Sequence, residues 1–166
     1  MEITLKDLKE LLTNEDLLKQ YTINVNLVKQ TIQQDLETLE IWTDGAYKPS
    51  TNQGGWSYIC SIDQQFGGEK ETTNNRMELT AVINALKFFN NNTYSKCIIY
   101  SDSQYVINTI NNNWKRNKNN DLWEQLDSLI SSNIKFVWVK GHDGNEMNEK
   151  ADKLAVLASQ EIDFKI

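Results

Sequence analysis

The sequence predicts an α/β fold in which a mixed five-stranded sheet is flanked by helices, with a short helical extension at the N-terminus. From about residue 39 onward, strand and helix patterns alternate in the order β-β-β-α-β-α-α-β-α, which is typical of a sheet covered by helices. The stretch KCIIYSDS at residues 96–103 is nearly continuous in apolar character, as in a central buried strand. The length of 166 residues and the apolar content of 39% suit one domain with a core and a short appendage.

The first three strands are expected to be antiparallel. LEIWTDGAY, at residues 39–47, predicts a strand that ends in a turn at Asp44-Gly45. GGWSYICSI, at residues 54–62, predicts a second strand that is rich in aromatic and β-branched residues. After the turn-prone DQQ, residues 66–72 (FGGEKET) are expected to return as a short third strand.

The remaining elements alternate between helix and strand. Residues 75–90 carry apolar side chains at helical spacing and predict a long helix. The fourth strand, at residues 96–103, is followed by two helices over residues 103–113 and 122–130. IKFVWVKGH, at residues 134–142, predicts the fifth strand, and residues 146–160 predict a closing amphipathic helix.

The N-terminal residues 1–38 are predicted to form two or three short helices of unknown role. Thr-x-x-acid patterns mark helix starts, and leucine and valine side chains form apolar stripes. So few helices bury too little surface to be stable alone. They could pack on the main domain, bind a protein partner or contact nucleic acid. We expect a monomer.

Composition excludes some classes of protein. No apolar run reaches the length of about 18 residues that a membrane span needs. The acidic, periodic start does not resemble a secretory signal, so a cytoplasmic protein is expected. Cys60 and Cys97 lie in strand-like apolar runs and are predicted to be buried thiols. The formal net charge of −6 does not exclude a nucleic-acid partner, because bound cations would offset the carboxylates.

Four acids lie where an α/β fold collects functional groups. Asp44 and Asp102 are expected at the ends of neighbouring strands, Glu78 in the first turn of the long helix, and Asp152 in the last helix. Carboxylates brought together in this way repel each other unless cations bind between them. Taken singly, each acid also suits an ordinary role in a turn, at a helix start or on a solvated helix face.

The sequence around the acids supports the metal-site interpretation. TDGAY, TTNNRMEL, YSDSQYV and WVKGHDGNEMNEKADKLA occur in this order and closely resemble motifs of the type 1 ribonuclease H (ribonuclease HI) family, over about residues 40–160. The resemblance implies a ribonuclease H-like fold, with residues 39–166 as the catalytic domain. It also implies hydrolysis of the RNA strand of RNA–DNA hybrids with two Mg²⁺ ions, for which Mn²⁺ is expected to substitute, leaving 5′-phosphate and 3′-hydroxyl ends.

The resemblance assigns roles to the residues near the metals. Asp44, Glu78, Asp102 and Asp152 match the acids that bind the ions and are catalytic. His142, which alone would be taken for a surface loop residue, matches a mobile catalytic histidine that assists proton transfer and product release. Glu149 is similar to a family acid near the metals and is a candidate for an accessory role.

The resemblance also implies contacts to the hybrid. Asn74, Asn75 and Gln104 match positions that contact the minor groove, where an amide can pair with a 2′-hydroxyl or a base edge. Thr73 resembles a contact to a DNA phosphate. The ordinary alternatives are a helix cap for Asn75, a solvated helix face for Gln104 and a turn for Thr73.

Two regions depart from the family pattern. Many bacterial members carry a long basic helix and loop after DSQYV, whereas this chain has a reduced basic patch of Trp114, Lys115, Arg116 and Lys118. We therefore expect weaker and more salt-sensitive hybrid binding than in relatives with the full segment. The turn after the first acid also differs, and Asn52 is a candidate accessory amide there.

Two other functions remain open at this point. One is a catalytically silent ribonuclease H-like module for binding or assembly. The other is a nuclease domain derived from a reverse transcriptase or mobile element. The intact set of four acids favours an active enzyme over the silent module, and the short chain with its own extension favours a free-standing protein.

Overall fold

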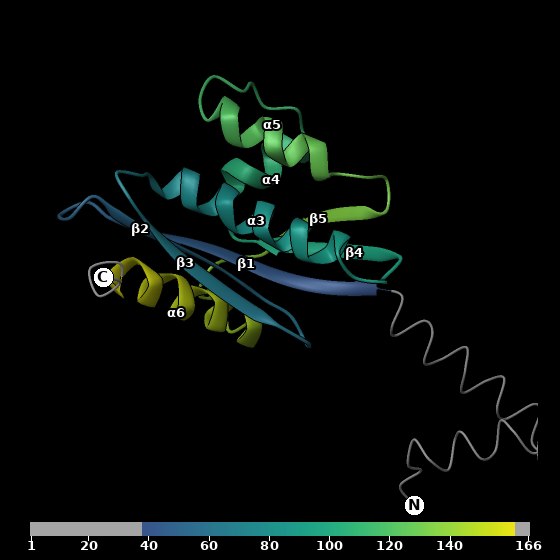
Figure 1. Cartoon of the computed structure of the whole chain (residues 1–166), viewed down its shortest axis with the longest axis horizontal. Coiled ribbons are helices and arrows are strands. Elements are labelled where there is room, and N and C mark those ends of the chain that lie inside the picture. The colour runs from purple at the N-terminus through teal and green to yellow at the C-terminus, as the bar shows by residue number, and fades with distance from the viewer. Residues whose placement is uncertain (1–37, 162–166) are drawn as a thin grey trace, which may run out of the picture. The chain divides into compact units, whose positions relative to one another are not determined.

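The computed structural model describes residues 38–161 (Figure 1). The chain divides into two units between residues 37 and 38. The predicted helical extension therefore lies outside the described residues, apart from Thr38, which belongs to the first strand. Its fold and role stay predictions.

The sheet has the predicted mixed form, with five strands in the order β3-β2-β1-β4-β5. The pairs β1–β2 and β2–β3 are antiparallel, and the pairs β1–β4 and β4–β5 are parallel. The strands are β1 Thr38–Lys48, β2 Gln53–Ile59, β3 Gln64–Lys70, β4 Lys96–Ser101 and β5 Ile134–Trp138. The predicted antiparallel arrangement of the first three strands is confirmed.

The predicted turn at Asp44-Gly45 is wrong. Strand β1 continues through both residues to Lys48, because Asp44 pairs with Ser57 and Gly45 with Trp56 on β2. A Cβ atom on Gly45 would lie 2.4 Å from the Glu78 backbone nitrogen. The glycine therefore allows close packing of a helix against the strand and does not form a turn.

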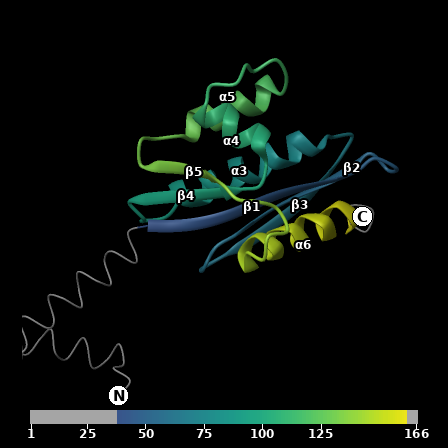
Figure 2. The same ribbon diagram turned by 180° about the vertical axis from the view of Figure 1, so that it is seen from behind.

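Helices lie on both faces of the sheet (Figures 1 and 2). The helices are α3 Asn74–Asn90, α4 Gln104–Asn111, α5 Asn120–Leu129 and α6 Glu146–Glu161. On one face, α3 packs on β1 and β2, α4 packs beside β5, and α5 packs on α3. On the other face, α6 lies over β2, β1 and β3. The predicted order of strands and helices is confirmed.

Two expectations about the start of α3 are wrong: the alternative that Asn75 caps the helix, and the placement of Glu78 in its first turn. The N-cap is Thr73 and not Asn75: the Thr73 side chain accepts a hydrogen bond of 3.1 Å from the Arg76 backbone N–H. Asn74 is thus the first helical residue, which places Glu78 in the second turn and not the first. The acid is therefore too far along the helix to serve as an N-terminal dipole partner.

The core lies between the sheet and α3. On α3, three apolar side chains recur at helical spacing and are fully buried: Leu79, Val82 and Leu86. Ile41 and Ile99 on the central strands are also 0% exposed. Cys60 and Cys97 are buried free thiols, as predicted. Among the residues that the structure describes, no helix has the length and apolarity to cross a membrane.

Candidate metal centre and active site

Asp44 and Asp102 are brought together by the end of a parallel strand pair. The last paired residues of β1 and β4 are Thr43 and Ser101, and each aspartate follows directly. Asp44 is 2% exposed, because β1 continues between β2 and the end of β4. The two carboxylates therefore meet at one edge of the parallel pair, as the sequence predicted.

Glu78 joins them from helix α3. The helix approaches β1 closely at Gly45, so the Glu78 side chain reaches the two aspartates. Glu78 is buried there, at 4% exposure. Asp44, Glu78 and Asp102 each offer a carboxylate oxygen, and these three oxygens lie within 4.8 Å of one another. This spacing suits shared ligands of one small site.

Asp152 reaches the same place from the opposite face of the sheet. It lies in α6, is half-buried, and lines a cavity with the other three acids. Its carboxylate is near enough to Asp44 to help raise the pKa of Asp44. The structure thus brings all four predicted acids together from three different elements and the end of a fourth.

The electrostatics of this cluster are unfavourable for four negative charges. Burial is the largest cause that raises the pKa of Asp44, followed by the charges of Glu78 and Asp102. Burial and the Asp102 charge likewise raise the pKa of Glu78, against a hydrogen bond from the Gly45 backbone N–H that lowers it. Burial also raises the pKa of Asp102. Cations would relieve this repulsion.

The residues fit a divalent metal. Asp44 Oδ2 and Glu78 Oε2 are buried and have no hydrogen-bond partner among the described residues. Buried polar atoms without a partner are uncommon, because leaving them unpaired is costly. An all-oxygen set of carboxylates is the donor set that hard divalent cations such as Mg²⁺ and Mn²⁺ prefer.

An open cavity of about 400 Å³ surrounds the acids. Its lining consists of polar side chains and one glycine: Asp44, Gly45, Asn74, Asn75, Glu78, Asp102, Ser103, Gln104, Tyr105 and Asp152. The predicted amide residues Asn74, Asn75 and Gln104 therefore lie beside the acids, at the first positions of α3 and α4. Thr73 caps α3 next to them and is exposed.

Tyr105 is a lining residue that the sequence analysis did not single out. Its hydroxyl accepts hydrogen bonds of 3.1 Å from Asn119 Nδ2 and from Trp123 Nε1. These bonds connect α4 to the residues at the start of α5. Its place directly after Gln104 in YSDSQYV was a signal that could have pointed to it.

His142 lies in the loop beside Asp102, outside the cavity lining. It is exposed, has a left-handed backbone (φ 56°), and lies near enough to Asp102 to oppose slightly the burial that raises the pKa of that acid. A Cβ atom on neighbouring Gly141 would lie 3.0 Å from Asp102 Oδ2, so the loop packs directly against this acid. The catalytic role of His142 stays a prediction.

The two accessory candidates do not line the cavity. Glu149 is exposed in the first turn of α6. Asn52 has a left-handed backbone in the β1–β2 hairpin, where its Oδ1 accepts a hydrogen bond of 2.7 Å from the Tyr47 hydroxyl. Asn52 therefore has a local structural role, whatever else it contacts.

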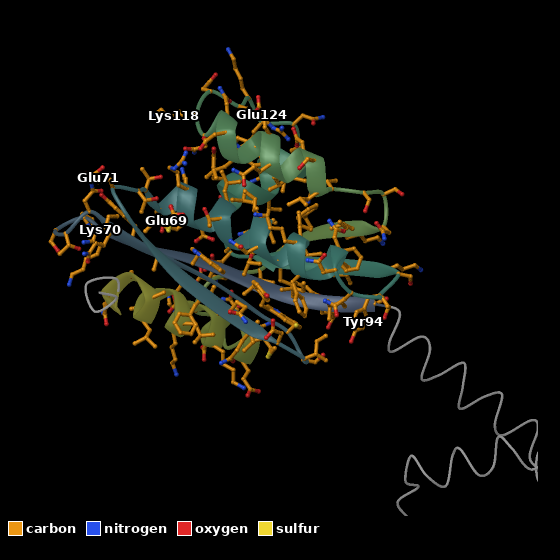
Figure 3. All side chains as sticks on the ribbon, in the orientation of Figure 1. Glu69, Lys70, Glu71, Tyr94, Lys118 and Glu124 are labelled. Atoms are coloured by element: carbon orange, nitrogen blue, oxygen red, sulfur yellow. The ribbon has the colours of Figure 1, made fainter. Side chains whose placement is uncertain are left out.

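The basic patch also lies outside the cavity lining. Trp114 is 49% exposed, and Lys115 is exposed. Figure 3 shows the Lys118 side chain projecting outward near the start of α5. Arg116 is paired within the fold: its Nη1 lies 2.6 Å from Asp127 Oδ2, and its guanidinium lies 4.6 Å from the centre of the Trp123 ring. Part of the Arg116 charge is thus already engaged.

Comparison with known proteins identifies the family. The family model described as RNase H matches residues 36–160. Ribonuclease H of Treponema denticola is 43% identical, over 75% of this chain and 98% of that protein. Ribonuclease HI of Neisseria meningitidis serogroup B is 44% identical, over 72% of this chain and 93% of that protein.

A solved structure gives the same result. The crystal structure of LC9-RNase H1, described as a type 1 RNase H with the type 2 active-site motif, superposes with a TM-score of 0.63. It is 25% identical, and the match covers 74% of this chain and 72% of that one. Sequence motifs, fold and relatives agree, and the chain belongs to the type 1 ribonuclease H family.

Proposed function

We propose that this protein is a metal-dependent endonuclease that hydrolyses the RNA strand of RNA–DNA hybrids and leaves 5′-phosphate and 3′-hydroxyl ends. The observation that carries the proposal is the acidic cluster. Three carboxylates offer oxygens within 4.8 Å of one another, and two buried oxygens have no partner among the described residues. Membership of the ribonuclease H family supplies the reaction class.

The four acids would hold two Mg²⁺ ions, and Mn²⁺ would substitute. When bound, such ions lower the pKa of a water molecule and neutralise the leaving oxygen. Asp44, Glu78 and Asp102 would supply ligands from β1, α3 and the end of β4, and Asp152 from α6. His142 would move protons at the edge of the site. This role is supported by the packing of its loop against Asp102.

The amides beside the acids would recognise the hybrid. Asn74, Asn75 and Gln104 line the same cavity as the acids, so a strand cleaved there would lie within their reach. Their amides can both donate to and accept from a 2′-hydroxyl, the group that distinguishes RNA from DNA. Thr73 would contact a phosphate from its place at the α3 N-terminus.

The basic patch would add affinity that does not depend on sequence. Trp114 and Lys115 are exposed, and Arg116 shares its charge with Asp127. Contacts from such a patch to phosphates release counterions, so their contribution falls as salt rises. Glu149 and Asn52 remain candidates for an accessory role.

A silent binding module is the second candidate, and the site argues against it. Buried like charges destabilise a fold, and a module without chemistry would have no reason to retain them. We further propose that the protein is cytoplasmic and that it is a monomer. Light scattering would test the monomeric state. The buried free thiols Cys60 and Cys97 are compatible with a reducing compartment.

The decisive experiment incubates the full chain with labelled hybrid, double-stranded RNA and double-stranded DNA, in Mg²⁺ or in chelator. The expected result is cleavage of the RNA strand of the hybrid in Mg²⁺ alone, with both other duplexes intact. The control is Asp102→Asn, which should bind hybrid without cutting it. Equal cutting of double-stranded RNA, or an active Asp102→Asn variant, would refute the proposal.

A further inference from the structure

The position of Asp152 depends on how one helix docks on the sheet. Asp44 lies on β1, Asp102 directly follows the adjacent strand β4, and Glu78 lies on a helix that touches β1. Asp152 alone among the four acids comes from α6, on the opposite face (Figures 1 and 2). A small shift of α6 along the sheet would therefore move Asp152 relative to the other three acids.

Helix α6 approaches β2 closely through small residues. A Cβ atom on Gly55 would lie 2.1 Å from the Ala155 carbonyl oxygen and 2.4 Å from the Ser159 nitrogen. Ala155 and Ala158 are also buried, at 0% and 3% exposure. Contact between such smooth surfaces sets the height of the helix above the sheet. It provides no directional bond that would hold the helix against sliding.

Ser57 provides a directional bond. Its side chain is 0% exposed, and its hydroxyl donates a hydrogen bond of 2.5 Å to the Ala151 carbonyl oxygen of α6. Ser57 is the residue on β2 that pairs with Asp44, and Ala151 directly precedes Asp152. One hydrogen bond thus joins the strand partner of one acid to the backbone beside another.

The bond is not needed to satisfy the helix. Ala151 lies inside α6, where the N–H of the residue four positions later can donate to its carbonyl oxygen. An alanine at position 57 would fill nearly the same space without burying a hydroxyl. The buried serine is therefore better explained by the orientation that its hydrogen bond imposes than by a demand of the fold.

We propose that Ser57 is a positioning residue that fixes Asp152 relative to the other metal ligands. The inference rests on the proposed metal-dependent function. The hydroxyl of Ser57 holds the first half of α6 in register with β2, and it does so without using a carboxylate oxygen. The residue acts through Asp152 and has no contact of its own with metal or substrate.

The test is the affinity of the full chain for Mn²⁺, measured by titration calorimetry without substrate. We expect Ser57→Ala to weaken the affinity about tenfold, as is typical when a group that orients a metal ligand is lost. Ser159→Ala is the matched control, because Ser159 is 4% exposed and its hydroxyl donates within α6, to the Val156 carbonyl oxygen. This control should retain the wild-type affinity.

A double-mutant cycle separates positioning from general destabilisation. If Ser57 acts through Asp152, adding Ser57→Ala to Asp152→Asn produces no further loss of Mn²⁺ affinity. Thermal unfolding in chelator shows whether Ser57→Ala and Ser159→Ala lose similar stability.

Two results would overturn the inference: wild-type affinity in Ser57→Ala, or an undiminished loss in the Asp152→Asn background. Wild-type protein that binds no Mn²⁺ would instead refute the proposed metal-dependent function.

Discussion

Replacing Gly45 by alanine tests whether close packing of α3 on β1 places Glu78. The new Cβ atom would lie 2.4 Å from the Glu78 nitrogen, 2.7 Å from the Met77 carbonyl carbon and 3.0 Å from the Glu78 Cα. All three are backbone atoms, so no side chain can rotate away. Ordinary contact begins at 3.4 Å, and α3 must therefore retreat by roughly 1 Å near Glu78.

This retreat moves a proposed metal ligand while the strands stay in place. A misplacement of about 1 Å at a catalytic group lowers the rate by about 10²-fold. Forcing an extra carbon atom into a packed contact also destabilises a fold by about 1–3 kcal/mol. We therefore expect Gly45→Ala to lose about 10²-fold in kcat/KM on hybrid while it remains folded.

The assay combines steady-state cleavage of labelled hybrid in saturating Mg²⁺ with urea unfolding in chelator. The control is Gly67→Ala, whose Cβ would meet side-chain atoms of Trp56, the nearest at 2.7 Å, on the edge pair β2–β3. It should lose stability and keep its cleavage rate. A Gly45→Ala enzyme with wild-type kcat/KM, or equal rate losses in both variants, would refute the reasoning.

Three further predictions concern charge. Burial raises the folded-state pKa of Asp44 above its ordinary value of 3.8, so the contribution of Asp44 to the free energy of unfolding in chelator falls by about 1.4 kcal/mol per pH unit between that value and the raised pKa. Asp44→Asn should flatten this dependence in urea titrations and abolish the rise in Tm that Mg²⁺ produces in the wild type; an unchanged slope would contradict the burial argument. Hybrid affinity should fall steeply between low and moderate salt, and a flat Kd in binding titrations would argue against phosphate contacts by the basic patch. His142→Ala should lower kcat about 10²-fold with unchanged Mn²⁺ affinity, and a wild-type kcat would remove His142 from the mechanism.

Much of the fold could be predicted because local patterns and packing agree. The apolar run that became β4 and the helical spacing that became α3 each specify an element and its buried face. The continuation of β1 through Asp44 and Gly45 could not be predicted, because the local turn preference of these residues competed with pairing to β2. The pairing prevailed, and it depends on residues that are distant in the sequence.

The acids of the site could be predicted from their motifs, whereas the groups that support them could not. Ser57 bonds to Ala151 across 94 residues, and Tyr105 accepts from Trp123 across 18 residues. No spacing rule predicts which side chain meets which partner at such distances. Short motifs indicate the residues of a site, but the contacts between layers become visible only in the folded chain.

Three side chains near the acids, those of Thr43, Ser57 and Trp138, share one property. Each makes a hydrogen bond to the main chain beside an acid and leaves the carboxylate oxygens unused. The bonds are Thr43 Oγ1 to the Tyr100 carbonyl (3.0 Å), Ser57 Oγ to the Ala151 carbonyl (2.5 Å) and Trp138 Nε1 to the Asp102 carbonyl (3.1 Å). They hold the backbone near Asp44, Asp152 and Asp102, respectively.

That arrangement resolves a conflict within the site. Like charges would push the acids apart, and direct hydrogen bonds to their carboxylates would hold them but would also occupy the oxygens that a cation needs. Holding the backbone opposes the repulsion and keeps those oxygens available. The buried, unpartnered Asp44 Oδ2 and Glu78 Oε2 are what this arrangement leaves behind. Their free energy cost is recovered only when a divalent cation binds, so the metal should stabilise the fold as well as enable the reaction.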